Sequence, residues 1–103
     1  MDNKELKQYN IRIYGKICMC GYKLMKSNPM TMHHIIPLSW GGKTNVVNSS
    51  NVTYLPHTGI HILYDDDKNK ARKIIEYLRY FKEHPDTEMA KKFARWLDNK
   101  CRS

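Results

Sequence analysis

Alternating apolar and polar positions predict two short strands in the middle of the chain. Residues 31–36, TMHHII, favour a strand, and Pro37 stops it because proline lacks the N–H that a central strand needs. Residues 51–55, NVTYL, form a second such run, which is closed by Pro56. A flexible polar loop begins at Gly41 between the two runs. The pattern therefore predicts an antiparallel hairpin with a long loop.

The segment before the hairpin is less regular. Residues 9–14, YNIRIY, alternate loosely and place Ile11 and Ile13 on one face. This pattern predicts a short strand, or the end of an N-terminal helix that runs into one.

A helical period dominates the rest of the chain. Apolar side chains recur at close to 3.6 residues over 59–83, with an interruption at Asp65–Asp67. Acidic groups favour a first turn, so the interruption predicts the start of a second helix. After a break at 84–86, residues 87–100 predict another helix, capped by Asp86 or Thr87. The expected fold is α+β, with a hairpin, a helix and additional C-terminal helices.

Length and charge narrow the class of protein. A chain of 103 residues predicts a single domain, 1–103. The N-terminus has no apolar signal region and no run approaches a membrane span, so we expect a cytoplasmic protein without a membrane partner. The net charge of +8 is typical of a domain that meets a polyanion, most often nucleic acid.

The histidines are concentrated where fixed charges are scarce. Residues 33–61 hold a single charged side chain, Lys43, and four of the five histidines. Basic segments flank this stretch on both sides. The pattern indicates a metal site framed by a phosphate-binding surface.

The cysteines do not predict a metal site or a disulfide framework. They number three, and Cys18 and Cys20 are separated by one residue, tighter than in a usual zinc knuckle. We expect reduced, structurally ordinary thiols at these two positions and at Cys101.

Two histidine pairs carry the candidate chemistry. His33 and His34 are adjacent at the end of the first predicted strand, where a local twist would bring both to one cleft from different sides. His57 and His61 are four residues apart, so a helix places both rings on one face. Three imidazoles with one open position is the arrangement of a catalytic metal site.

The order of these features resembles the HNH endonuclease family, whose fold is a ββα-metal core. The resemblance is carried by HHIIPLSWGG at 33–42, NSSN at 48–51, NVTYL at 51–55, and the histidines 57 and 61. ICMCGYKL, which precedes them, is similar to a degenerate form of the family's cysteine-bearing turn. The resemblance covers residues 17–65 as the core, with 66–103 as a helical C-terminal extension.

The resemblance implies a role for each matched residue. His33 would be a metal ligand, and His34 would be the general base that takes a proton from the attacking water. A central asparagine would orient that base by a hydrogen bond. Residues on the helix would complete the metal site.

Two alignments of the second half remain open. Counting from the glycine pair makes Asn48 the central asparagine and places His57 and His61 at the helix ligands. Counting from the strand pattern favours Asn51 instead, with His61 as a ligand after a one-residue insertion and Asp65 as the other ligand. His61 is a ligand in both alignments.

The expected function is hydrolysis of DNA phosphodiester bonds, most simply in duplex DNA, by a monomer or homodimer. The resemblance implies one divalent ion, Mg²⁺, Mn²⁺, Ni²⁺ or Zn²⁺, and products with 5′-phosphate and 3′-hydroxyl ends. A phage or a mobile element would be a fitting source. The alternative is a non-catalytic module of the same fold that holds a structural metal and binds nucleic acid or a larger assembly.

Overall fold

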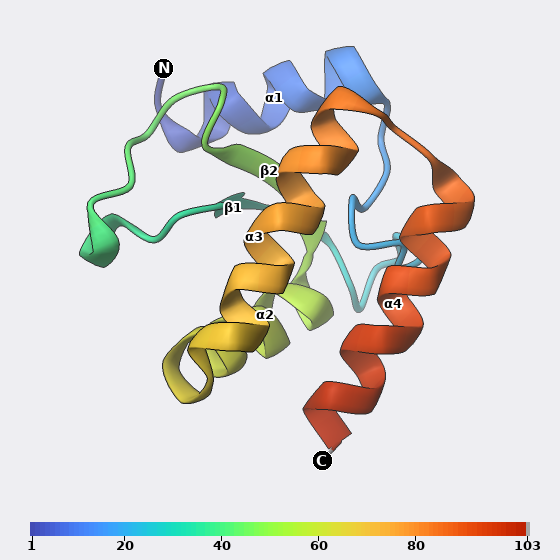
Figure 1. Ribbon diagram of the computed structural model, residues 1–103. Coiled ribbons are helices and arrows are strands. Elements are labelled where there is room, and N and C mark those ends of the chain that lie inside the picture. The colour runs from blue at the N-terminus through green and yellow to red at the C-terminus, as the bar shows by residue number, and fades with distance from the viewer. Residues whose placement is uncertain (103) are drawn as a thin grey trace.

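Four helices surround a small sheet (Figure 1). The structure, a computed structural model, describes residues 1–102. In chain order its elements are the helix α1 (Asn3–Tyr14), the strand β1 (Met30–His34), the 3₁₀ helix η1 (Leu38–Trp40), the strand β2 (Ser49–Thr53) and the helices α2 (Tyr54–Asp66), α3 (Lys68–Glu83) and α4 (Thr87–Arg102). The α+β prediction is confirmed.

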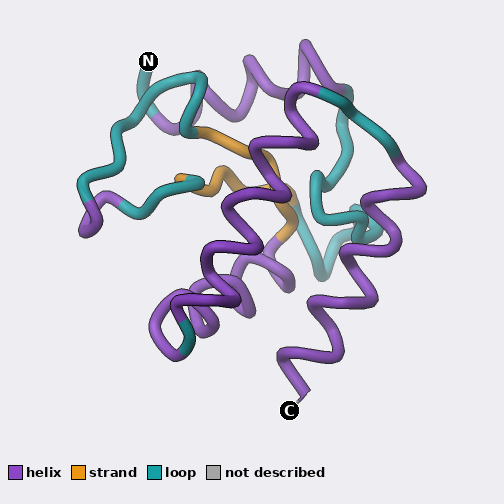
Figure 2. Tube along the Cα trace, in the orientation of Figure 1, coloured by secondary structure: helices purple, strands orange, loops and turns teal. Residues whose placement is uncertain are grey.

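The two strands and the helix that follows them form the predicted ββα unit. Strand β1 pairs antiparallel with β2, so that His33 lies opposite Ser50 and His34 opposite Ser49. Figure 2 shows the long teal loop that joins the strands and the short helix within it. Helix α2 begins at the residue after β2 and packs on both strands. The sheet thus sits between α1 and α2.

The second strand lies two residues earlier than predicted. It covers Ser49–Thr53, whereas Tyr54 and Leu55 already belong to α2. Pro56 does not close a strand: it occupies the first turn of α2, where backbone N–H groups have no partner inside the helix and their loss costs little. Thr53 is the N-cap residue, so strand and helix are joined without a linker.

Of the two alternatives for residues 9–14, the strand is wrong and the end of an N-terminal helix is confirmed, because these residues end helix α1. A capping box starts this helix, with Glu5 N–H donating to Asp2 Oδ1 at 2.8 Å and Asp2 N–H donating to Glu5 Oε1 at 3.1 Å. Its buried side chains are Leu6 and Asn10, which are four residues apart, whereas Ile13 is exposed. The helical spacing of the buried pair therefore outweighs the local alternation.

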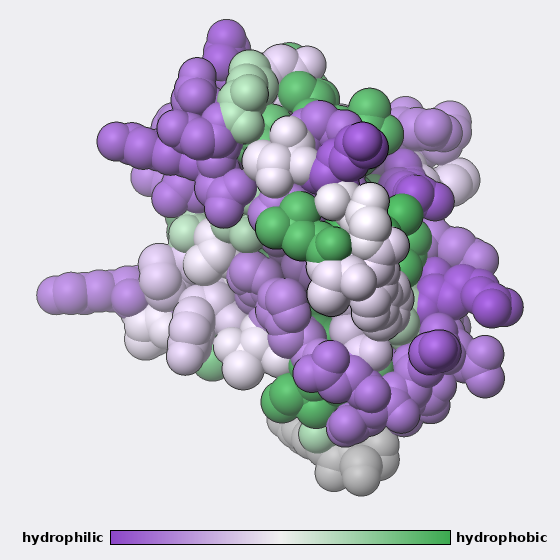
Figure 3. All heavy atoms as spheres, turned by 90° about the vertical axis from the view of Figure 1, so that its left-hand side faces the viewer, coloured by the Kyte–Doolittle hydropathy of each residue, from purple (hydrophilic) through white to green (hydrophobic). Residues whose placement is uncertain are grey.

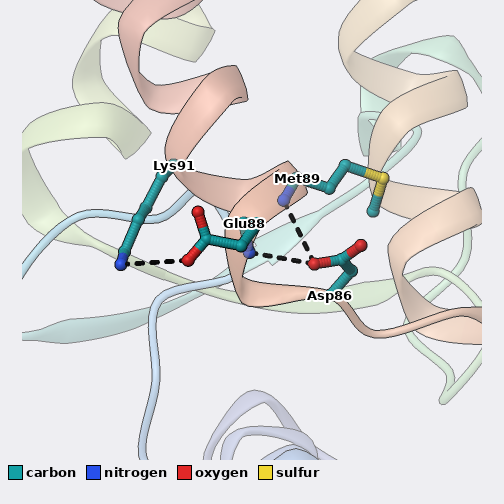
Figure 4. A network of polar contacts seen from close by, with 4 residues as sticks. All are labelled: Asp86, Glu88, Met89 and Lys91. Carbon is teal, nitrogen blue, oxygen red and sulfur yellow. Dashed lines mark hydrogen bonds and ion pairs between the residues drawn. The ribbon is translucent and has the colours of Figure 1, made fainter.

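Aspartates separate the last three helices, as predicted. Asp67 caps α3 by accepting hydrogen bonds from the backbone N–H groups of Asn69 and Lys70. Asp86 accepts from the N–H groups of Glu88 and Met89 at 2.9 and 3.3 Å and so caps α4 (Figure 4). The negative carboxylates also suit the positive ends of the helix dipoles.

The apolar faces of α3 and α4 close the core over the sheet and α2. Tyr77 of α3 stacks on Phe93 of α4 with ring centroids 3.8 Å apart. Lys82 of α3 donates from Nζ to the carbonyl of Ser49 at 2.6 Å and also to that of Val46, which fixes the start of β2. Within residues 1–102, no helix has the length and apolar content needed to span a membrane.

The segment between α1 and β1 contacts α4 through a glycine. Gly21 has a φ of 82°, and a Cβ built there would lie 2.2 Å from the carbonyl oxygen of Ala90. Gly15, which ends α1, has a similar φ of 87° but no atom within 4 Å of its Cβ position. The two glycines share the backbone strain and differ only in the space around them.

We predict that Gly21→Ala destabilises the fold much more than Gly15→Ala. The Gly15 change carries only the positive-φ cost, about 1–2 kcal/mol. The Gly21 change adds a collision with the backbone of α4, so we expect a loss above about 3 kcal/mol. Urea unfolding of both variants measures the difference, and equal losses would contradict the close contact.

Candidate metal centre

Three histidines from β1 and α2 converge at the junction between sheet and helix. One ring nitrogen from each of His33, His57 and His61 lies within 4.8 Å of the others. The ring of His33 stands edge-on to those of His57 and His61, at centroid distances of 5.0 and 5.5 Å. The i, i+4 spacing on α2 aligns His57 with His61, whose Nε2 atoms are 3.0 Å apart.

The three histidines of the cluster differ in exposure to solvent, from the core to the surface. His33 is 1% exposed, His57 is half-buried and His61 is exposed. Burial lowers the pKa of His33 well below its usual range, and it lowers the pKa of His57 to about 4, with the neighbouring histidines adding to both effects. Both rings are therefore neutral at pH 7, the form that binds metals.

A hydroxyl group fixes which nitrogen of His57 is free. Thr31 Oγ1 lies 2.6 Å from the carbonyl oxygen of Val52 and 2.8 Å from His57 Nδ1. The single hydroxyl proton must go to the carbonyl, because the carbonyl has no proton to give. His57 Nδ1 then donates to Thr31, and the lone pair of His57 lies on Nε2, which points to His61.

The same reasoning applies to His33. Tyr64 OH donates to the carbonyl of Ile35 at 2.8 Å, so it accepts a hydrogen bond from His33 Nε2–H at 3.2 Å. The lone pair of His33 is thereby placed on Nδ1. This atom is buried and has no hydrogen-bond partner. A buried acceptor without a partner is costly unless it binds something.

The donor set fits a divalent cation. Ligand nitrogens at about 2.0–2.1 Å from a tetrahedral zinc ion are about 3.3 Å from one another. The Nε2 atoms of His57 and His61 are already near this spacing at 3.0 Å, and a ring nitrogen of His33 lies within 4.8 Å of the other two ligand atoms. His61, the third member, is exposed to solvent. Imidazole ligands favour borderline ions such as Zn²⁺ and Ni²⁺ over Mg²⁺.

His34 lies beside the cluster but belongs to a different network. It is the neighbour of His33 in β1, so its ring points away from that of His33. Its Nε2 is 3.1 Å from Thr44 Oγ1 of the long loop. Burial is the main cause of the lowered pKa of His33 and His57, and the neighbouring His34 adds to it, in keeping with a ring that lies close to the cluster.

Asn48 organises the loop between the strands. Its Nδ2 donates to the carbonyls of Ile36 and Lys43, both at 2.9 Å, and its Oδ1 accepts from Ile36 N–H at 2.8 Å. The backbone comes so close here that a Cβ on Gly42 would lie 1.9 Å from the Ile36 oxygen. This clamp sets the path of the loop between Ile36 and Asn48, and that loop carries Thr44 to His34.

Asn51 serves another contact. Its Nδ2 donates to the carbonyl of Lys7 at 2.9 Å and so ties β2 to α1. The predicted hydrogen bond from a central asparagine to His34 stays a prediction: the Asn48 amide is engaged by the loop backbone, whereas Asn51 Oδ1 is buried without a hydrogen-bond partner. The Nδ2 groups of both asparagines donate to backbone carbonyls, and Thr44 Oγ1 is the group bonded to the ring of His34.

Comparison with known proteins now bears on this arrangement. Residues 18–54, about a third of the chain, match the family model described as HNH endonuclease. This segment is therefore similar to HNH endonucleases. No curated protein and no solved structure matches it.

The HNH match and the histidine cluster are complementary. The matched segment contains His33, His34, Asn48 and Asn51, and it ends at residue 54. His57 and His61 lie beyond it on α2, so their part in the site rests on the geometry alone. The cluster contains His57 and does not contain Asp65, the competing ligand, which is exposed near the end of α2.

Cys18, in the matched segment, contacts the junction between β2 and α2. Cys18 Sγ accepts hydrogen bonds from the N–H and hydroxyl of Thr53, the N-cap of α2, at 3.3 and 3.4 Å. A hydrogen bond from Cys20 lowers the pKa of Cys18 to about 6. Within the described residues all three cysteines are free, and none joins the metal cluster.

Sequence reasoning missed three residues of this site: Thr31, Thr44 and Tyr64. Each acts through a hydroxyl on a histidine nitrogen. Tyr64 lies three residues after His61, which is a visible signal, since that spacing also shares a helix face. Thr31 and Thr44 give no such signal, because their partners are distant in sequence.

We predict that Tyr64→Phe and Thr31→Val each weaken binding of Zn²⁺ by about 10- to 100-fold, the usual effect of losing a hydrogen bond to a ligand histidine. The variants remove the hydroxyls that hold the lone pairs of His33 and His57 toward the cluster. Isothermal titration with Zn²⁺ measures the affinity. Tyr80→Phe, an exposed tyrosine on α3, is the matched control; wild-type affinity in both site variants would refute the proton assignment.

Proposed function

We propose that this protein is a metal-dependent endonuclease that hydrolyses DNA phosphodiester bonds. The observation that carries the proposal is the convergence of three histidines, two with their lone pairs fixed by neighbouring hydroxyls, beside a fourth histidine in the segment that matches the HNH endonuclease model. HNH domains are typical of nucleases that act on nucleic acid.

His33, His57 and His61 would hold one divalent ion. When bound, such an ion supplies Lewis-acid stabilisation of the scissile phosphate and of the leaving 3′ oxygen. The ligand set is neutral, so the full positive charge of the ion is available to the phosphate. The exposed side of His61 leaves room for the phosphate to approach.

His34 would be the general base. A neutral imidazole nitrogen can accept the proton of a water as that water attacks phosphorus. The bond to the 3′ oxygen then breaks, leaving a 5′-phosphate and, after protonation, a 3′-hydroxyl. Thr44 would hold the ring of His34 by its hydrogen bond. Asn48 would position Thr44 indirectly, through its hydrogen bonds to the loop backbone. A base of this kind contributes about 10²–10⁴-fold to the rate.

The charge of the chain supports a nucleic-acid substrate. The net charge of +8 attracts a phosphate backbone without reading sequence. We propose duplex DNA as the substrate and a cytoplasmic location, with which the free cysteines are compatible. A single site cuts one strand, so a monomer would nick and a double-strand cut would need a homodimer or two encounters.

We predict that His34→Ala abolishes cleavage while keeping the affinity for metal, because His34 lies outside the ligand cluster. His33→Ala and His61→Ala should lose both. The assay incubates supercoiled plasmid with protein and Mg²⁺, Mn²⁺, Ni²⁺ or Zn²⁺, with and without EDTA, and equilibrium dialysis measures the bound metal.

His84→Ala is the matched control, since this exposed histidine lies at the break between α3 and α4, away from the cluster. Cleavage by His34→Ala at the wild-type rate would refute the mechanism. Plasmid binding in a gel shift without EDTA-sensitive nicking would refute the nuclease and favour the non-catalytic module.

A further inference from the structure

An exposed tryptophan stands beside the candidate metal centre and is not used by it. Trp40 belongs to η1 in the long loop and is 45% exposed. One face of its ring stacks on Tyr64, with centroids 5.4 Å apart and ring planes 20° apart. Tyr64 in turn contacts His33 at a centroid distance of 5.5 Å. Trp40 is therefore a single ring removed from the cluster.

A hollow separates Trp40 from α3. It has a volume of about 340 Å³ and is lined by Trp40, Lys68, Arg72 and Ile75. The three residues of α3 follow the i, i+4, i+7 pattern, so they form one face of that helix. An aromatic ring and an aliphatic side chain thus line the hollow together with two cations.

The cations are available to a ligand. The ion pairs within the described residues join Lys70 to Asp67 and Lys91 to Glu88, and neither involves Lys68 or Arg72. Both side chains are exposed. Figure 3 views the side that carries the long loop, where pale and green side chains gather in the middle of a hydrophilic, purple surround.

We propose that this hollow binds an unpaired nucleotide of a DNA strand, with the base stacked in the hollow against Trp40 and the phosphate held by Lys68 and Arg72. Flat aromatic rings beside cations are the usual means of binding single strands, because every base has a π-face. A nucleotide offers a flat ring to Trp40 and a phosphate to the two cations at the same time.

The hollow lies close to the metal cluster, so a base bound there would affect where DNA is cut. This consequence rests on the proposed function. One ring separates Trp40 from His33. A strand advances about 3.4 Å per nucleotide, so a base in the hollow lies within a few nucleotides of a phosphate at the cluster. The hollow would thus direct cleavage to DNA with an unpaired or frayed base near the cut.

The test measures the binding of short, fluorescein-labelled single-stranded DNA by anisotropy, in EDTA so that no cleavage occurs. Trp40→Leu should weaken binding by about 5- to 100-fold, the range expected for loss of one stacked base. Trp40→Phe should restore most of the affinity. Leu38→Ala is the matched control, since Leu38 is an exposed residue of the same turn that does not line the hollow.

Two further measurements separate stacking from charge. An abasic strand of the same length should bind wild type and Trp40→Leu equally. Arg72→Gln should reduce the slope of log affinity against log salt by about 0.7, as expected for one phosphate contact in a single strand. In Trp96→Phe, where Trp40 is the only tryptophan, the fluorescence should be quenched by the strand with bases and unchanged by the abasic one.

Unchanged affinity in Trp40→Leu, or equally tight binding of the abasic strand by wild type, would overturn the proposal. Its failure differs from that of the nuclease. EDTA-sensitive nicking with Trp40-independent binding would remove the base site alone. Trp40-dependent binding without nicking would remove the nuclease and leave the base site.

Discussion

The direct passage from β2 into α2 is the constraint on which the site depends. Thr53 ends the strand and occupies the N-cap position of the helix, so no flexible linker separates the two elements. Pairing of the strands sets the position of His33, and the first turns of α2 set those of His57 and His61. Cys18 holds the junction itself by accepting two hydrogen bonds from Thr53. A metal centre at this point needs no loop to position its ligands.

The hydroxyl groups around the cluster fix which nitrogen of each neighbouring histidine carries the proton. By passing their own protons to backbone carbonyls, Thr31 and Tyr64 force the histidines to donate from one nitrogen and keep the other bare. The backbone carbonyls thereby determine which nitrogen of each ring carries the proton. Neutral, preoriented ligands bind a cation without first losing a proton or rotating, which reduces the cost of binding.

The sequence predicted the cluster because its signals are local or ordered along the chain. The pair His33–His34, the loop glycines and the i, i+4 pair on a helix are all visible in one dimension. The strand at 9–14 was wrong because burial of Leu6 and a capping box decided for a helix. The prediction that Pro56 closes a strand was wrong because proline is also favoured in the first turn of a helix.

The hydrogen bonds between segments distant in the chain could not be predicted from the sequence. Thr44 reaches His34 only because Asn48 clamps the loop onto its own backbone. Both asparagines were identified as candidates, but nothing in their spacing showed that their Nδ2 groups donate to backbone carbonyls. Such choices depend on how the loop and α1 pack, and they are settled only once the whole chain is folded.

The central claim is that three imidazoles of one chain hold a single divalent ion. X-ray absorption at the zinc edge, on protein loaded with one equivalent of Zn²⁺, tests it most directly. The account predicts a first shell of nitrogen and oxygen at about 2.0–2.1 Å with the outer-shell pattern of three imidazoles. Sulfur at about 2.3 Å would place the ion at the cysteines instead and contradict the claim.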